Sequence, residues 1–367
     1  MNYPNLKKLG DFVHEVDERN TDLSVRRLVG VNLQKKFMPS VANIIGTDLS
    51  RYKIVRYNQF GLKLMSVERD RKMPISLMKS TEPGIISTAY FVFEVNDEKE
   101  LLPDYLFLQI KQPEFDRRLW FSTGGDVRGG ATWENLMDMP ILVPPIAEQK
   151  RIVAQHQAIY SRITDCEHII EGLDDCAQTI YRKTFIEDVD NESLPAGWKR
   201  GIIDDIAKIS AGGDRPEVFS NIKTEACSIP IYSNGIVDDG LYGFTNEPRI
   251  NEESVTVSAR GTIGFVCYRN HPYVPIVRLL VFIPKDKSTV TPLYLFFLLS
   301  NTKLEGDGAV QLQLTAPKTK EIEIVIPTAG VIQDFTRRIE PLVYYKQCLK
   351  REIEALKNLI NTILSVA

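Results

Sequence analysis

The strongest structural signal comes from residues 146–184, which read IAEQKRIVAQHQAIYSRITDCEHIIEGLDDCAQTIYRKT and follow Pro144 and Pro145. Apolar or small residues, with a few polar interruptions, alternate there at spacings of four and three: Ile152, His156, Ile159, Ile163, Cys166, Ile170, Leu173, Ala177, Ile180 and Thr184. This alternation predicts one long helix with a heptad seam. At about 1.5 Å per residue, a helix of roughly 35–40 residues would extend ~50–60 Å.

A second seam of the same kind lies at the end of the sequence. It shows the same alternation at Phe335, Ile339, Leu342, Lys346, Leu349, Ile353, Leu356, Ile360 and Ile363. A seam this long cannot be buried by an isolated helix. We therefore expect the two helices to pack as an antiparallel coiled coil that holds the remaining parts of the chain at a fixed distance.

The regions before the two helices repeat as well. Residues 103–107 (PDYLF) are echoed by 292–296 (PLYLF), and 142–149 (LVPPIAEQ) by 324–333 (IVIPTAGVIQ). Both regions are rich in β-branched and aromatic residues with Gly, Pro and Asn between them, a pattern typical of α+β domains. The sequence predicts an α+β fold with a pseudo-two-fold internal repeat: domain one over 1–145, spacer helix one over 146–190, domain two over 191–328 and spacer helix two over 329–367.

Composition limits the class of protein. The 367 residues are 43% hydrophobic and 25% charged with a net charge of −3, which argues against wholesale disorder and against a bulk polycation. No apolar run approaches the roughly 18 residues of a membrane helix. The five cysteines form no CxxC pair, and the first residues show no apolar export segment. A reduced, cytoplasmic protein is expected.

Two domains on a rigid spacer suit an extended ligand read at two places, and duplex DNA is the obvious candidate. Basic residues interleaved with Tyr, Asn and Gln support it, and they nominate as DNA contacts Arg51, Lys53, Arg56, Arg69, Arg71 and Lys72 in the first domain. Glycine-rich turns and a stretch without acids nominate Arg215, Asn234, Arg260 and Thr262 in the second. A solvated strand face or an ordinary hairpin would show the same patterns, and a coiled-coil scaffold for protein partners would show the same geometry.

Several motifs match a known family. They are Leu9-Gly10-Asp11-Phe12, residues 84–93 (GIISTAYFVF), residues 144–153 (PPIAEQKRIV), Leu194-Pro195-Ala196-Gly197-Trp198, Ser233-Asn234-Gly235 and residues 258–264 (SARGTIG). On these motifs the chain resembles the specificity subunit of type I restriction–modification enzymes over essentially its whole length. The proline-to-glutamine motif that opens the first spacer helix is the most specific, and the second copy departs from it at residues 327–333 (PTAGVIQ).

The resemblance implies two target-recognition domains that each read one half of a bipartite double-stranded DNA site, with the paired conserved helices setting the spacing. It implies two docked modification subunits, which bind S-adenosylmethionine and methylate adenine, and restriction subunits that use ATP and Mg²⁺ for translocation and cleavage. For subunit docking the helix entrances are nominated: Gln149, Lys150, Arg151, Gln333, Arg337 and Arg338.

The residues also favour a chain without catalytic activity of its own. The sequence contains no GxxxxGK[ST] phosphate loop and no Asn-Pro-Pro-aromatic or Asp-Pro-Pro-aromatic tetrapeptide. Its four histidines, His14, His156, His168 and His271, are scattered, which makes a metal site improbable. Two alternatives stay open: the specificity chain of another DNA-modification or defence complex, and a coiled-coil scaffold or inhibitor that mimics the subunit without reading DNA.

Overall fold

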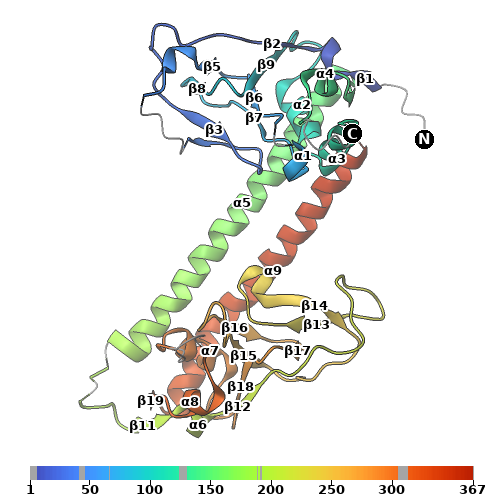
Figure 1. Cartoon of the computed structure of the whole chain (residues 1–367). Helices are drawn as coiled ribbons and strands as arrows, with labels where there is room; N and C mark the ends of the chain where they lie inside the picture. Colours follow the sequence, from blue (N-terminus) through green and yellow to red (C-terminus); the bar gives the residue numbers. More distant parts are fainter. Residues whose placement is uncertain are drawn as a thin grey trace. The chain divides into compact units, whose positions relative to one another are not determined.

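The computed structural model describes residues 6–40, 46–65, 67–123, 130–187, 189–190, 192–304 and 313–366. The chain divides into two compact units: Met1–Asp165 with Glu352–Ala367, and Cys166–Arg351. Each unit contains an α+β domain and one end of each of two long helices (Figure 1). The predicted start of domain two at residue 191 lies outside the described residues, as does residue 367.

The first unit is built on a four-stranded antiparallel sheet in the order β2-β9-β6-β7. Its strands are β1 Leu6–Lys8, β2 Val13–Glu15, β3 Val29–Val31, β4 Phe37–Pro39, β5 Lys53–Val55, β6 Phe60–Leu62, β7 Ile75–Leu77, β8 Gly84–Ile86, β9 Phe91–Val95 and β10 Pro140–Leu142. Its short helices are α1 Val67–Asp70, α2 Pro103–Ile110, α3 Pro113–Ser122 and α4 Trp133–Met137, with 3₁₀ turns at Leu9–Asp11 and Leu49–Arg51. Three smaller antiparallel pairs, β1–β10, β3–β4 and β5–β8, complete the domain.

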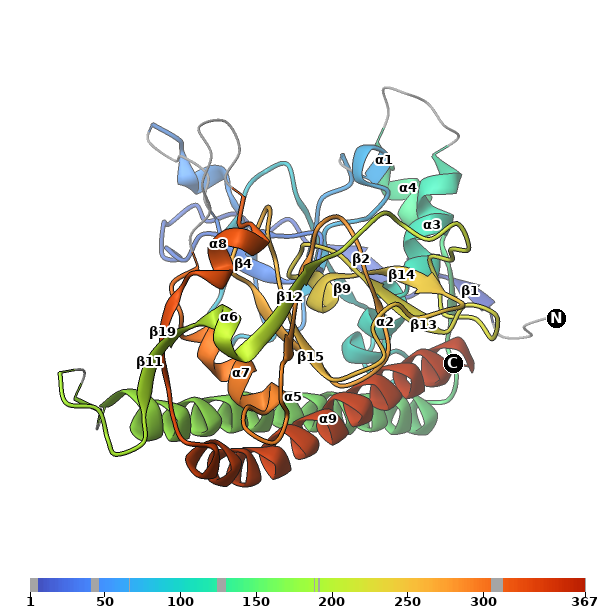
Figure 2. The same cartoon turned by 90° about the horizontal axis from the view of Figure 1, so that it is seen from below.

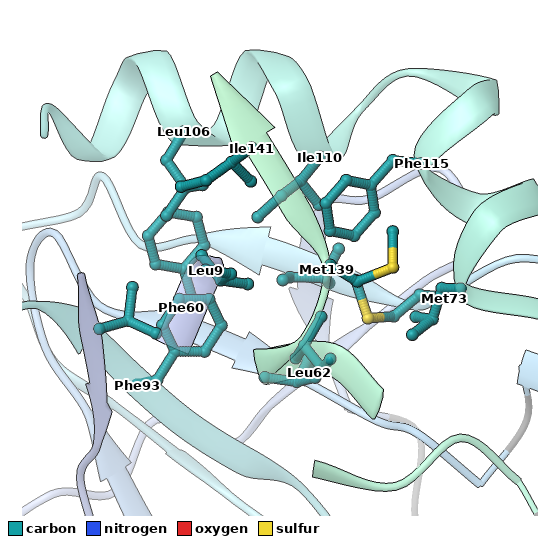
Figure 3. Close-up of a cluster of buried hydrophobic side chains, with 14 of the residues drawn as sticks. Leu9, Phe60, Leu62, Met73, Phe93, Leu106, Ile110, Phe115, Met139 and Ile141 are labelled. Atoms are coloured by element: carbon teal, nitrogen blue, oxygen red, sulfur yellow. The ribbon is translucent and has the colours of Figure 1, made fainter. Parts of the chain in front are cut away.

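The core of this domain lies between the sheet and the helices α2 and α3 (Figure 3). Phe60 and Phe93 stack face to face from neighbouring strands, with ring centroids 4.5 Å apart. Both helices begin with proline at the first helical position, where the missing N–H is not needed. Their buried residues, such as Leu106 and Ile110, pack on the aromatic pair and on Leu9.

The second unit repeats the plan. Its main sheet is antiparallel in the order β12-β18-β15-β16, and β13 pairs antiparallel with β14 and parallel with β17. The strands are β11 Lys199–Ile202, β12 Ala207–Ala211, β13 Ile229–Tyr232, β14 Leu241–Thr245, β15 Ser254–Val257, β16 Val266–Arg269, β17 Val274–Pro275, β18 Leu280–Pro284 and β19 Glu323–Ile326. The short helices are α6 Ile203–Ile206, α7 Pro292–Ser300 and α8 Ala316–Lys320, with a 3₁₀ turn at Val237–Gly240. Strands β11 and β19 lie side by side (Figure 2).

The duplication predicted from the sequence is confirmed inside each unit. The two main sheets have the same strand order, and each is preceded by a strand that pairs with the one leading into a long helix. Individual backbone bonds recur: Leu9 N–H donates to Met139 O (2.9 Å), and Ile203 N–H donates to Ile322 O (3.0 Å). This shared pattern identifies one structural unit present twice.

The long helices are α5 (Ile146–Arg182), which continues into a π-helical turn at Lys183–Glu187, and α9 (Ala329–Val366). All predicted seam residues of both helices are buried or half-buried. In the first unit Arg162 of α5 forms a two-pronged ion pair with Glu352 of α9, at 2.7 and 3.0 Å. In the second unit Lys346 of α9 reaches Asp174 of α5 at 2.6 Å. Also in the second unit, Tyr181 of α5 meets Phe335 of α9, with ring centroids 5.8 Å apart. Since later α5 residues meet earlier α9 residues there, the helices pack antiparallel, as predicted.

Candidate nucleic-acid interface

The predicted basic residues of strand β5 and its surroundings are balanced by carboxylates from residues 15–18. Lys53 is only 5% exposed, and its ammonium lies 2.9 Å from Glu15 Oε1 and 3.4 Å from Asp17 Oδ1. Arg56 donates two bonds to Glu18, and this contact holds the pKa of the Glu18 carboxyl below its usual value. The excess of positive charge that the sequence shows between residues 51 and 72 is therefore partly neutralised by carboxylates of the same domain.

The remaining predicted residues of the first domain lie at two separate elements. Arg51 is exposed at the end of a 3₁₀ turn. Arg69 is exposed on α1 and pairs with the adjacent Asp70 at 2.8 Å, while Arg71 places its guanidinium 4.8 Å from the Trp120 ring centroid. Lys72 is exposed beside it. We therefore retain the exposed residues as DNA-contact predictions, namely Arg51, Arg56, Arg69, Arg71 and Lys72, and assign Lys53 a structural role, since it is buried.

In the second domain four loops that are far apart in the sequence meet. We call residues 212–215, 233–235, 258–262 and 276–278 the loop cluster. Asn234 joins two of these loops, because its Nδ2 donates to Val277 O (2.7 Å) and its Oδ1 accepts from Ala259 N–H (2.7 Å). Gly212 packs so closely on the strand before Val277 that a Cβ atom there would stand 2.7 Å from the Pro275 carbonyl carbon.

The loop cluster brings several of the predicted residues into one region. Arg260 donates from Nη2 to Gln313 Oε1 (2.9 Å), and its buried Nε has no hydrogen-bond partner among the described residues. Arg215 places its guanidinium 4.7 Å from the Phe219 ring centroid, and Thr262 is exposed. Gln313 and Arg278 are not among the DNA contacts predicted from the sequence. Arg278 lies within an acid-free stretch that gave a weak signal, but its proximity to Asn234 depends on a contact 43 residues apart in the chain.

Arg269, from the same acid-free stretch, has a structural role. It is 4% exposed, and its guanidinium lies 3.6 Å from the Tyr232 ring centroid. Its Nε donates to Thr256 Oγ1 and its Nη2 to Asp239 O. This side chain is thus used to join β16 to neighbouring segments of the domain.

His271 is half-buried and contacts Tyr232, the same ring that Arg269 contacts, and it predicts a pH dependence of stability. Its Nε2 lies 3.0 Å from the Tyr232 hydroxyl, its Nδ1 faces Asn270 Oδ1, and burial, followed by the charge of Arg269, lowers its pKa below 6.5. Because the unfolded chain binds the proton at a higher pH than the folded chain, stability should fall as pH drops below about 6.5. Urea midpoints of the second unit at pH 7.5 and 5.5 should differ less in His271→Gln than in the parent; an unchanged difference would contradict this assignment.

The helix entrances differ in how their glutamines are used. Gln149 is fully buried: its Oε1 accepts from Leu102 N–H (2.9 Å), and its Nε2 donates to Glu100 O and Pro144 O (both 2.8 Å). Gln333 holds the equivalent loop more loosely, donating to Ser288 O (3.1 Å) and Lys287 O (3.4 Å). The glutamine of this motif therefore connects each long helix to its own domain by hydrogen bonds. The Gln149 amide makes these bonds inside the protein, where a partner cannot reach it.

The charged residues of the entrances are exposed. Lys150 and Arg151 lie on the first turns of α5, where Arg151 pairs with Glu148. Arg337 and Arg338 lie on the early turns of α9 and both reach Asp334. These four side chains are accessible to a partner. Their role in docking stays a prediction.

Both the sequence and the fold of this chain are similar to those of known proteins. Residues 195–358 match the family described as type I restriction modification DNA specificity domain. A stretch of 113 residues, 30% of this chain, is 36% identical to the C-terminus of a putative type I specificity subunit from Mycoplasma pneumoniae and covers 77% of that sequence. This chain belongs to the type I specificity subunit family. The resemblance derived from the motifs is confirmed.

Two further putative type I specificity subunits from Mycoplasma pneumoniae are similar to part of the chain. One is 40% identical over 141 residues, which are 38% of each protein. The other is 34% identical over 148 residues, or 40% of this chain and 44% of the relative. The matches thus span less than half the length of these two relatives.

Solved structures support the fold over almost the whole chain. The S subunit of a type I restriction–modification system from M. genitalium matches 99% of this chain and 96% of its own, with a TM-score of 0.61 and 14% identity. A structure from work on complex assembly and conformational transition of the type I system matches 99% and 97%, with a TM-score of 0.50 and 18% identity. At such identities the likeness shows the fold, which is the α+β architecture with two long helices expected for a specificity subunit.

Two kinds of feature are absent from the residues that the structure describes. Across them, no helix is both long enough and apolar enough to pass through a bilayer. Nor do three or more His, Cys, Asp or Glu side chains gather there into a group that could hold a metal ion.

Proposed function

We propose that this specificity subunit reads a bipartite site in double-stranded DNA, with one half read by each α+β domain. The observation that carries the proposal is the duplication: the same sheet order and the same backbone bonds occur twice, and each copy leads into its own long helix. A two-part protein of this kind suits a two-part ligand. Because the helices are continuous and antiparallel, they are suited to setting the spacing between the halves.

The proposed complex also includes partner proteins. In it, two modification subunits bind S-adenosylmethionine and methylate adenine, and restriction subunits use ATP and Mg²⁺. Lys150, Arg151, Arg337 and Arg338 are the docking residues that we retain, because they are exposed at the helix entrances. Gln149 supports docking indirectly, by orienting α5, since its own side chain is buried. This chain contributes recognition and no catalytic step.

The charge of the domains is consistent with recognition that depends on partners. Residues 1–143 contain 20 Lys and Arg against 19 Asp and Glu, and residues 194–327 contain 14 against 15, so the net charges are +1 and −1. Phosphate contacts by Lys and Arg supply most non-specific DNA affinity. The isolated chain should therefore bind DNA weakly, and tight binding should require the modification subunits.

Methylome sequencing tests the proposal. A host that expresses this chain together with its modification subunits should gain one split adenine-methylation motif, which is missing when this gene alone is deleted. The double variant Arg71→Ala, Lys72→Ala should alter or weaken recognition of one half of the motif only. The slope of log affinity against log salt concentration should be lower by about one for each phosphate contact that is lost. A complex with an active methyltransferase and no split motif would contradict DNA reading and favour a scaffold or inhibitor.

A further inference from the structure

A strained turn in the loop cluster presents an arginine. Val277 and Arg278 both have left-handed backbone angles, with φ of 53° and 59°. Side chains disfavour this region, and β-branched valine does so most strongly, so glycine would be the expected residue at both positions. The surroundings nevertheless hold the turn, because Val277 N–H donates to Gly213 O (2.9 Å) and Arg278 N–H to Gly212 O (3.0 Å).

One amide connects this turn to a second arginine loop. Asn234 binds Val277 O with its Nδ2 and Ala259 N–H with its Oδ1, both at 2.7 Å. Ala259 immediately precedes Arg260, whose guanidinium is held by Gln313 and whose buried Nε has no acceptor among the described residues. The Asn234 side chain thus sets the positions of Arg260 and Arg278 relative to each other.

The guanidinium of Arg278 is placed differently from those of other arginines in this domain. Arg215 lies over Phe219, Arg249 donates to Asp214 O, and Arg269 is buried against Tyr232. Arg278 is exposed, and within the described part of the chain no carboxylate is recorded within ion-pair distance of it. Strain kept at an exposed, charged residue is typical of a functional site.

We propose that Arg278 reads a guanine in the second half-site, with its guanidinium donating to guanine O6 and N7 in the major groove. A planar fork of donors matches these two acceptors better than it matches any other base edge. Asn234 is a positioning residue, because its amide joins the Arg278 turn to the Arg260 loop. This inference rests on the proposed DNA-reading function and specifies one contact of it.

The test uses the whole complex and compares Arg278→Gly with Arg278→Ala by methylome sequencing of the host genome. Both variants should keep the first half of the motif and turn one guanine of the second half into a degenerate position, with discrimination there reduced roughly 5- to 150-fold. Only Arg278→Gly relieves the backbone strain, so its thermal midpoint should equal or exceed that of the parent. Lys223→Ala, an exposed base of the same domain outside the loop cluster, should change neither motif nor midpoint.

Two further measurements separate base reading from phosphate contact and from a purely structural role. Replacing the assigned guanine by 7-deazaguanine in a duplex should weaken binding by the parent complex and leave the Arg278→Ala complex unaffected. Asn234→Asp, which keeps the acceptor for Ala259 and loses the donor to Val277, should relax the same guanine position.

An unchanged motif in both Arg278 variants, or a uniform loss of methylation with no degenerate position, would overturn the inference while the proposed function stands. A parent complex without any split motif would instead refute the proposed function.

Discussion

Replacing Lys35 by methionine should lower the free energy of unfolding of the first unit by about 3–5 kcal/mol. The Lys35 ammonium donates to Asp116 Oδ1 (2.9 Å) and to Ile110 O (2.6 Å), and the two side chains are 7% and 8% exposed. Asp116 Oδ1 also accepts from Met73 N–H (3.1 Å). Removing the ammonium leaves a carboxylate buried without its counter-charge, which costs far more than the contact itself contributes.

Tryptophan fluorescence can follow this unit separately during urea unfolding. Trp120 and Trp133 lie in the first unit and Trp198 in the second, so a Trp198→Phe background reports the first unit alone. The double variant Lys35→Met with Asp116→Asn should recover much of the loss, because both charges are then absent and the amide oxygen of residue 116 can still accept from Met73 N–H. The exposed pair Lys8–Asp138 is the matched control, and Lys8→Met should leave the urea midpoint unchanged. Equal losses in the single and double variants would refute the buried-charge explanation.

Replacing Gln149 by leucine should lower the free energy of unfolding by about 3 kcal/mol, whereas Gln333→Leu should lower it by about 1 kcal/mol or less. The first change removes three hydrogen bonds made by a fully buried amide, to Leu102 N–H, Glu100 O and Pro144 O, at about 0.5–1.5 kcal/mol for each bond. The second removes two longer bonds from a half-buried side chain. Each loss is measured by urea unfolding of the unit that contains the glutamine.

The same pair of variants tests what the Gln149 contact does for the complex. Because its amide joins the start of α5 to the first domain, Gln149→Leu should reduce methylation of the whole split motif by the proposed complex, without relaxing any base position. Gln333→Leu should retain most of the parent's methylation. Similar losses of stability in the two variants would show that the buried amide does not hold the first joint more tightly than the second.

Much of the fold was predictable because its main signals are periodic. The seam from Ile152 to Thr184 predicted α5, and the echo of residues 103–107 in residues 292–296 predicted the repeat that appears as matching helices α2 and α7. Heptad spacing depends on local helix geometry, so it can be read without knowing any long-range contact. Sheet order could not be read in this way, because strand pairing is decided between segments far apart in the chain.

The candidate site was less predictable, for an electrostatic reason. Lys53 and Arg56 belong to a basic stretch, yet Glu15, Asp17 and Glu18 balance them across a fold that brings residues 38 positions apart together. In the second domain, Asn234 and Arg260 were predicted as separate contacts and lie in one loop cluster. Counting charges along the chain does not reveal which of them meet.

The family, the duplication and the two long helices could be predicted from the sequence, because motifs, repeats and heptad spacing are carried by neighbouring residues. Which of the predicted side chains are accessible depends on the folded structure. In the folded chain the Gln149 side chain is buried and holds the start of α5, and Lys53 is buried beside carboxylates. Arg278 lies on a strained turn that Asn234 contacts. Burial and hydrogen bonding of a polar side chain depend on partners from distant segments, and those partners are assembled only when the chain folds.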